Sequence, residues 1–241
     1  MPADSWILAA AFIITVAAAL VQGTIGFGLS VVSVPLLSLL DRDLAPVPQL
    51  LIALPLAVAM VWREWRHLDL AGVGWVLVGR FPGAAVGVVL LKLYSDSALD
   101  LLIGGLVLAG VAIVASGVVI RLNPATQVAA GLASGIMGLV ASVGGPPLAL
   151  LYRNAEGGRL RSSLNAIFAI GIVFSILVRT ATGEISGNDV RVGAFLVPAA
   201  FLGLWLSRFF TARAEGAALK NGVLAISALA ATGLLVRSIV G

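Results

Sequence analysis

The sequence has 241 residues, of which 60% are hydrophobic and only 11% are charged. Soluble domains carry about 25% charged residues, so this composition excludes an ordinary soluble protein. The absence of cysteine excludes disulfides, thiolate metal sites and cysteine nucleophiles. The net charge of +4 does not indicate nucleic-acid binding, because basic residues are expected beside membrane spans.

The charged residues stand in short stretches between long apolar runs, which predicts an all-α polytopic membrane protein. A transmembrane β-barrel would show short alternating segments instead. A spanning helix needs about 20 apolar residues. Six uninterrupted runs have a suitable length, namely 44–62, 72–93, 98–120, 163–179, 190–207 and 219–239.

Two further apolar regions, 6–40 and 125–152, are each interrupted by a glycine-rich break. The first break reads QGTIGFGLS (22–30), and the second reads MGLVASVGGPP (137–147). Non-helical backbone at membrane depth is tolerated only where protein buries it or water lines it. We therefore predict a broken or re-entrant hairpin in each half of the chain. Paired breaks of this kind indicate the binding site of a transporter.

The residues at the breaks predict where the second arm of each hairpin begins. Glycines allow the backbone to turn or to approach a ligand, and proline suits the first turn of a helix. The second arms should therefore begin near Leu29 or Ser30 and near Pro146. Helix N-termini carry unpaired N–H donors and a partial positive charge, so two of them near the midplane would attract an anion. Close helix packing is the alternative, and it is the interpretation we favour for GLASG (131–135).

The charges of the loops predict the orientation in the membrane. Three basic loops should be cytoplasmic by the positive-inside rule, namely 62–67, 153–161 and 208–220. Three neutral or acidic loops should face outward, namely 41–43, 93–100 and 180–191. With Arg121 also inside, each half has one hairpin and three crossings, and the halves are inverted. The prediction is one transmembrane domain made of two inverted-topology repeats, 1–121 and 122–241.

The two predicted repeats also share a sequence pattern. FPGAAVGVVLLKLY (81–94) resembles VPAAFLGLWLSRFF (197–210), with prolines, glycines and basic residues at matching places. Chance similarity between apolar helices is the alternative, because glycine and proline are frequent in membrane helices.

Two polar side chains fall inside predicted spans. Arg80 is the one basic residue well inside a span, and an intramembrane charge indicates function because it is costly to bury. The alternative is that Arg80 reaches the interface or bonds free carbonyls of a broken helix. Asn165 lies one turn into its span, where it either lines the substrate path or bonds a neighbouring helix.

All the carboxylates fall in predicted loops or at span ends. This pattern speaks against a cation transporter or a proton relay. It also speaks against an enzyme, since hydrolysis at the breaks would need metal-binding carboxylates or a general base. No nucleotide-binding loop is present, so ATP-driven transport by this chain is not expected, and no cofactor is predicted.

The two breaks and their flanks resemble the sulfite exporter TauE/SafE family. The segments concerned are GTIGFGLSVVSVPLL (23–37), GLASGIMGLVASVGGPPLALLY (131–152) and RSSLNAIF (161–168). The order and spacing of the family pattern extend over nearly the whole chain. Residues 141–143 depart from it, because family members often carry more glycine there. The resemblance implies a membrane transporter of small sulfur anions such as sulfite or organosulfonates.

The sequence thus predicts a multi-pass transporter of the inner membrane. Export is the expected direction of transport. The partners of the transporter would be a small anion and the lipid bilayer, and the small size of the chain is compatible with a homodimer. A transporter of other small organic acids and an anion channel are the alternatives. The predicted substrate-binding residues are Gln22, Gly23, Thr24, Gly26, Phe27, Gly28, Ser30, Arg80, Gly138, Ser142, Gly144, Gly145, Pro146 and Asn165.

Overall fold

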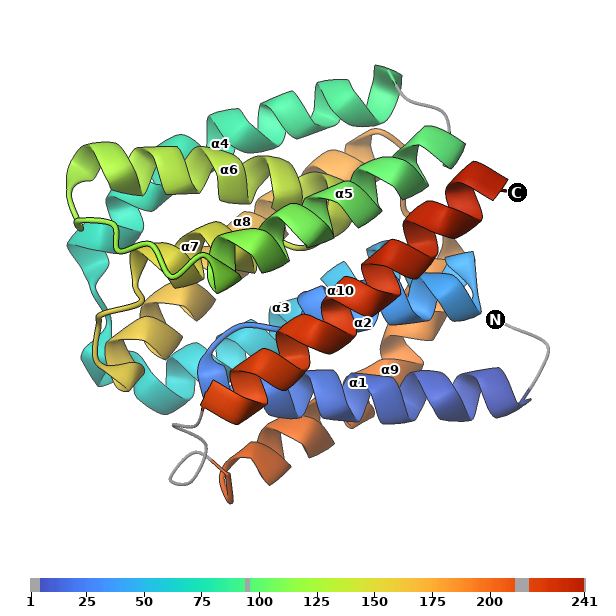
Figure 1. Ribbon diagram of the computed structural model, residues 1–241, viewed down its shortest axis with the longest axis horizontal. Coiled ribbons are helices and arrows are strands. Elements are labelled where there is room, and N and C mark those ends of the chain that lie inside the picture. Colours follow the sequence, from blue (N-terminus) through green and yellow to red (C-terminus); the bar gives the residue numbers. More distant parts are fainter. Residues whose placement is uncertain (1–4, 94–95, 211–216, 241) are drawn as a thin grey trace.

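The computed structural model describes residues 5–93, 96–210 and 217–240 (Figure 1). Within these residues it contains only helices and no strand, which confirms the all-α prediction. The helices are α1 (Ser5–Ile25), α2 (Leu29–Leu40), α3 (Val47–Glu64), α4 (Leu70–Leu93), α5 (Asp96–Ala115), α6 (Pro124–Ala141), α7 (Gly145–Leu151), α8 (Gly157–Ala181), α9 (Gly187–Ser207) and α10 (Ala217–Val240). Two short 3-10 helices, Arg42–Leu44 and Trp65–His67, flank α3.

Six helical segments are long and apolar enough to cross a membrane, which confirms a multi-pass membrane protein. They are α1, Arg42–His67, α4, α6, α8 and α9. The set differs from the six predicted runs in two ways. Helices α1 and α6 continue past the first glycine of each break, Gly23 and Gly138, and are therefore long enough to span. The predicted runs 98–120 and 219–239 appear in the described residues only as the shorter apolar stretches Leu101–Ala115 and Leu224–Gly233. At 1.5 Å per residue, α1 is about 32 Å long and α6 about 27 Å. The broken hairpins therefore have one full-length arm and one short arm each.

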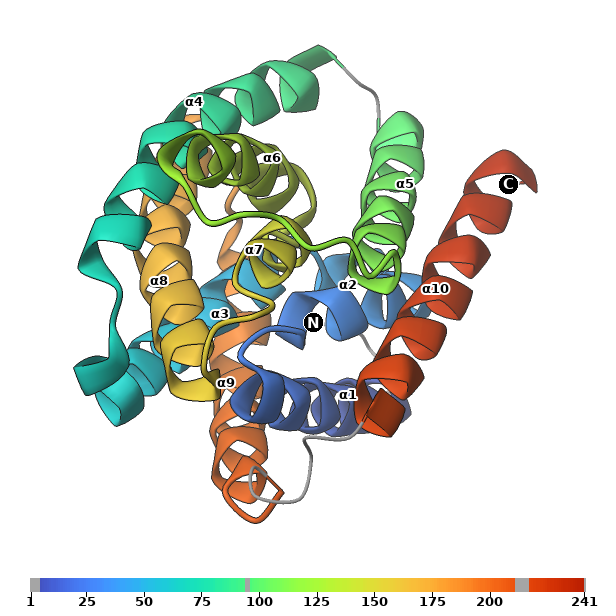
Figure 2. The same ribbon diagram turned by 60° about the vertical axis from the view of Figure 1, so that its left-hand side comes forward.

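The two hairpins enter the molecule from opposite ends. Helix α1 begins at the end marked N and α2 returns toward it, whereas α6 begins at the opposite end and α7 returns there (Figure 1). Figure 2 shows α2 and α7 near the centre of the bundle. Both breaks therefore lie inside the protein, where backbone that leaves the helix can be satisfied away from lipid.

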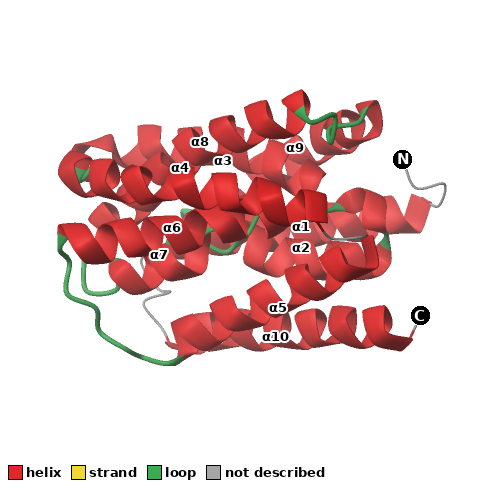
Figure 3. Ribbon diagram, turned by 90° about the horizontal axis from the view of Figure 1, so that it is seen from above, coloured by secondary structure: helices red, strands yellow, loops and turns green. Residues whose placement is uncertain are grey.

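The helices form three layers (Figure 3). The hairpin helices α1, α2, α6 and α7 form the middle layer. Helices α3, α4, α8 and α9 cover one face, where α4 packs on α6 and α1 packs on α9. Helices α5 and α10 cover the other face, where they contact α7 and α2 respectively. The middle layer is thereby shielded on both sides.

The packing of the two halves is reciprocal. Each helix of one half has a counterpart in the other, five helices later in the chain. Helix α4 contacts α6 and its counterpart α9 contacts α1, while α3 meets α8 and α5 meets α10. Two halves related by a two-fold axis produce such reciprocal contacts. The contacts are those expected of two repeats, but the repeats 1–121 and 122–241 and their inverted orientation in the membrane stay predictions.

Glycines allow α4 and α6 to pack with their backbones in contact. Gly79 and Gly83 of α4 lie against carbonyl groups of α6, and Gly131 and Gly135 of α6 lie against carbonyl groups of α4, so a Cβ at any of the four would collide with backbone. Small residues permit such close approach in membrane proteins. The packing interpretation of GLASG is therefore confirmed, and this contact places Arg80 beside the second break.

Candidate functional site

The backbone leaves the helical path at both breaks through residues with positive φ. These are Gly26 (φ 103°) and Gly28 (φ 129°) in the first break and Ser142 (φ 56°) in the second. Glycine adopts this conformation without strain, and serine does so only at a cost. Helix α2 then begins at Leu29 and α7 at Gly145, which confirms the predicted starts of the second arms.

The tips of the two hairpins touch each other. A Cβ placed on Gly145 would lie 3.3 Å from Cβ of Phe27, so the two breaks are in contact at this point. A cavity of about 30 Å³ lies beside this contact. Its volume corresponds to about two water molecules, so the site holds little free space in this structure.

Nine of the fourteen predicted site residues line this cavity. They are Gln22, Phe27, Gly28, Ser30, Arg80, Gly138, Ser142, Gly144 and Gly145. Six further lining residues carried no chemical signal in the sequence, because apolar residues are ordinary in a membrane helix. They are Val31, Leu50, Ala53, Val143, Phe168 and Ile172.

Arg80 brings its guanidinium to the cavity from α4 and is only 4% exposed. Its Nη1 donates a hydrogen bond to the Ser134 hydroxyl, which in turn donates to the Gly144 carbonyl at 2.6 Å. Cζ lies 5.9 Å from the centre of the Phe168 ring. This burial rules out the alternative in which Arg80 reaches the membrane interface, and the Gly144 carbonyl is bonded by Ser134 and not by Arg80.

Three glycines make the space that the Arg80 guanidinium occupies. A Cβ on Gly138 would lie 3.1 Å from Nη2, and one on Gly144 would lie 3.0 Å from Nη1. A Cβ on Gly171 of α8 would collide with Nε. The cradle thus draws on three separate elements, and only the glycines of the break were evident from the sequence.

Arg80 has no carboxylate partner among the residues that the structure describes. The ion pairs recorded there are Arg63–Glu64, Arg159–Asp69, Arg161–Glu64 and Arg179–Glu184. Apart from the bond to Ser134, no hydrogen bond from the Arg80 guanidinium is found in this part of the chain. A buried charge without a partner is costly, so this side of the cavity favours an anion.

Two amide side chains hold the first break in place. Nε2 of Gln22 donates to Oδ1 of Asn165 at 3.1 Å, and Oε1 of Gln22 accepts from the Leu29 N–H at 3.1 Å. Nδ2 of Asn165 donates to the Gly26 carbonyl at 3.0 Å. Asn165 therefore bonds neighbouring elements and does not itself line the cavity, whereas Gln22 does both.

The remaining predicted site residues face away from the cavity. Gly23 packs against Ser207 of α9, and the Thr24 hydroxyl donates to the Leu20 carbonyl of its own helix at 2.8 Å. Pro146 packs against Gly110 of α5. Within this arrangement these residues shape or support the breaks, and substrate contact by any of the fourteen residues stays a prediction.

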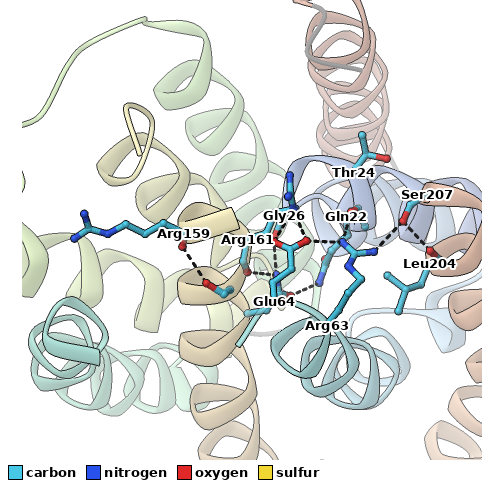
Figure 4. A network of polar contacts seen from close by, with 12 residues as sticks. Gln22, Thr24, Gly26, Arg63, Glu64, Arg159, Arg161, Leu204 and Ser207 are labelled. Carbon is cyan, nitrogen blue, oxygen red and sulfur yellow. Dashed lines mark hydrogen bonds and ion pairs between the residues drawn. The ribbon is translucent and has the colours of Figure 1, made fainter. Parts of the chain in front are cut away.

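A polar network joins the end of α1 to three other helices (Figure 4). Nη2 of Arg63 donates to the Gly23 carbonyl at 2.7 Å, and Nη1 of Arg63 donates to the Ser207 hydroxyl at 3.3 Å. Glu64 accepts from Arg161 Nε at 2.7 Å and 2.9 Å and from Arg63 at 3.2 Å. The network ties α1, α3, α8 and α9 together at the predicted cytoplasmic end.

A second cluster lies between the spans at the start of α4. The Asp69 carboxylate accepts from Arg159 Nη2 at 2.7 Å and from the Gly72 N–H at 3.0 Å. Burial alone would raise the pKa of Asp69, but these hydrogen bonds outweigh it and lower the pKa. Burial raises the pKa of the neighbouring Tyr152 hydroxyl, and the charge of Asp69 adds to that effect.

Broken helices whose ends meet at a buried cavity, inside a multi-pass helical protein, define the class of membrane transporters. The chain belongs to the sulfite exporter TauE/SafE family, whose family model matches residues 11–234. The match includes both breaks and confirms the resemblance found in the sequence. Membership implies a membrane transporter of sulfite or related anions and speaks against an enzyme. No curated protein and no solved structure matches the chain.

Proposed function

We propose that the protein is a secondary transporter that exports small sulfur-containing anions, such as sulfite or organosulfonates, across the inner membrane. The anion would bind in the cavity between the two breaks. The observation that carries the proposal is the buried guanidinium of Arg80, which reaches this cavity without a carboxylate partner in the described residues.

The chemistry of Arg80 suits an oxyanion. A guanidinium presents five N–H donors in a planar fork and stays charged at any physiological pH. One nitrogen is engaged by Ser134, which leaves donors on the other nitrogens for two substrate oxygens. Such paired, charge-assisted bonds are about twice as strong as neutral ones. The Ser30 hydroxyl also lines the cavity and can donate to the same anion.

The helix N-termini contribute less positive potential to the cavity than the sequence suggested. The first N–H of α2, at Leu29, already bonds Gln22, and α7 has only seven residues and begins with Gly145-Pro146-Pro147. Proline has no N–H to offer. The arginine, rather than the helix ends, is therefore the main source of positive potential in our proposal.

The small cavity fits a closed state of an alternating-access cycle. About 30 Å³ is too little space for an organosulfonate without movement of the surrounding helices. The reciprocal packing of the two halves supports a mechanism in which one half moves against the other. An inside-negative membrane potential favours exit of an anion, so export needs no nucleotide. One chain contains the whole site, so the proposal does not depend on the predicted homodimer.

The decisive experiment measures ligand-induced thermal stabilisation of the purified protein. The panel contains sulfite, sulfate, sulfoacetate, taurine, lactate and glycolate. A binder raises the melting temperature by mass action. We expect sulfite or a sulfonate to stabilise the wild type but not Arg80→Ala. Arg191→Ala serves as the matched control, because Arg191 is exposed on α9.

The panel also separates the alternatives. Stabilisation by lactate and glycolate alone would identify a transporter of organic acids and discard the sulfur assignment. Equal stabilisation of wild type and Arg80→Ala would refute the proposed role of Arg80. In proteoliposomes, flux that saturates with substrate supports a transporter, whereas flux that stays linear identifies an anion channel.

A further inference from the structure

The hydrogen bond from Arg63 closes the end of the full-length arm of the first hairpin. Its acceptor, the Gly23 carbonyl, belongs to the last turn of α1, which ends at Ile25. The last four carbonyls of a helix have no partner within the helix and carry a partial negative charge. A guanidinium from α3 therefore both satisfies this end and fixes it to a neighbouring helix.

Arg179 makes the corresponding contact at the second hairpin. Its Nη2 donates to the carbonyl of Leu139 and, at 3.3 Å, to that of Val140. Both carbonyls belong to the last turn of α6, which ends at Ala141. Nη1 of Arg179 pairs with Glu184 at 3.0 Å. Arg179 is 4% exposed, so its contact is inside the protein, whereas the Arg63 side chain is 23% exposed.

The two contacts occupy equivalent positions in the two halves. Arg63 and Arg179 are 116 residues apart (179 − 63), as are their acceptors Gly23 and Leu139 (139 − 23). Each arginine stands 40 residues after the carbonyl that it bonds. The same offset relates the two turn residues with positive φ, Gly26 and Ser142 (142 − 26). Each arginine also has a carboxylate partner, Glu64 or Glu184.

The two contacts lie at opposite ends of the molecule. Arg63 stands near the end of α3, and Arg179 stands near the end of α8, and these helices run in opposite directions (Figure 1). The cavity lies between the two ends, because it is lined by both breaks. Each arginine thus fastens one hairpin on one side of the cavity.

We propose that Arg63 and Arg179 are two equivalent locks. Arg63 closes the cavity toward the predicted cytoplasmic side, and Arg179 closes it toward the outside. Both hydrogen bonds are formed in this structure, in agreement with the small volume of the cavity. Transport requires that one lock opens while the other holds. The role of the locks rests on the proposed function, but the locks themselves are tested without any substrate.

The experiment uses the absence of native cysteine. A single cysteine is placed in the cavity as Ala53→Cys, and sealed vesicles of known orientation are treated with a membrane-impermeant maleimide from one side at a time. With Arg63→Ala, we expect labelling from the Arg63 side to rise about tenfold, the change that one charge-assisted hydrogen bond produces. With Arg179→Ala, the same rise should occur only from the opposite side.

Control variants distinguish the opening of one lock from a general loss of helix packing. Arg66→Ala and Arg191→Ala remove exposed arginines near the same two ends and should leave labelling unchanged. Glu64→Gln and Glu184→Gln weaken each lock without deleting the arginine, and they replace the alanine variants if these do not fold. Arg63→Lys and Arg179→Lys keep the charge and should restore part of the closure.

One-sided labelling that changes side between the two variants supports the locks. Unchanged labelling, or a rise from both sides with either variant, overturns them. The result is independent of the anion, because no substrate is present. If labelling behaves as expected but no anion of the panel binds, the locks stand and the proposed substrate fails. If an anion binds but labelling is unchanged, the proposed substrate stands and the locks are overturned.

Discussion

The two broken hairpins share one plan but differ in what holds their tips. The first tip is held by neutral amides, where Gln22 and Asn165 bond each other and the backbone of the turn. The second tip is held by a cation, where Arg80 bonds Ser134 and Ser134 bonds the Gly144 carbonyl. Position 138, the counterpart of Gln22 (138 − 22 is 116), is a glycine and makes room for the guanidinium. Positive charge therefore comes to the cavity from one half only.

This difference separates the two tips by function. An amide network that satisfies itself stabilises the fold with or without substrate. A buried cation without a partner destabilises the empty protein and is relieved by an anion. Substitutions at the first tip should therefore affect stability, whereas removal of the Arg80 charge at the second tip should weaken anion binding without a loss of stability.

The largest effect is expected at Arg80. Arg80→Gln removes the uncompensated charge, so anion affinity should fall by about 100-fold or more, the cost of removing one partner of a buried charge pair. The melting temperature of the empty protein should stay equal or rise, because replacing buried charge is often neutral or stabilising. Titration calorimetry and thermal unfolding measure the two quantities. A variant that loses stability and keeps its affinity would make Arg80 a structural residue.

The next largest effect is expected at Gly171, which lies under the Arg80 guanidinium. A Cβ from Gly171→Ala would collide with Nε and force the side chain to move. Overpacking of this kind costs about 1–3 kcal/mol, and the displaced guanidinium should also bind the anion more weakly. Thermal unfolding with and without anion measures both effects.

Gly74→Ala is the matched control for this substitution. Gly74 lies in α4, and a Cβ there would meet no atom within 4 Å. It should leave anion affinity unchanged and raise stability by up to about 1 kcal/mol, because alanine favours the helix. If Gly171→Ala behaves like Gly74→Ala, the cradle around Arg80 does not position it.

At the first tip, Gln22→Ala and Asn165→Ala should each destabilise the protein by about 1–3 kcal/mol, because each leaves buried groups without partners. The double variant should cost less than the sum of the two, since the residues bond each other. Denaturant unfolding of the four proteins gives the coupling energy. Strict additivity would contradict the amide network.

The sequence was sufficient to predict the class of protein and the position of both breaks. Long apolar runs and clustered glycines are local signals, and α2 and α7 begin within one residue of the predicted starts. It was not sufficient to show that α1 and α6 continue to Ile25 and Ala141, because glycine in a helix is tolerated when packing supports it. Nor does a local pattern show which helix ends need capping.

The lining of the cavity was predicted in part, for a related reason. Polar and glycine residues of the breaks were recognisable. Phe168 and Gly171, in contrast, stand on α8, 26 and 29 residues after Ser142 (168 − 142 and 171 − 142), and reach Arg80 only in the folded protein. Arg63 belongs to the basic loop 62–67 and Arg179 stands at the end of the predicted span 163–179, where basic residues are common. The 116-residue offset between them is visible in the sequence, but their equivalence becomes clear only when both are seen to bond a broken helix.

The smallest effect is expected outside both tips, at Asp69, which caps the start of α4. Asp69→Asn keeps an acceptor for the Gly72 N–H but loses the charge that pairs with Arg159. Because folding lowers the pKa of Asp69, the ionised carboxylate stabilises the protein above the unfolded-state pKa of about 3.9, and this contribution is lost as the pH falls through the lower folded-state value. Asp69→Asn should therefore be less stable than wild type by about 1 kcal/mol or less at neutral pH, as for a partly exposed ion pair at a helix start. The difference should shrink as the pH falls below about 4, and thermal unfolding across this range measures it.

A difference in stability that is the same at pH 3 and pH 7 would show that the charge of Asp69 contributes nothing. Anion binding at the cavity should be unaffected by Asp69→Asn at neutral pH, because Asp69 does not line the cavity.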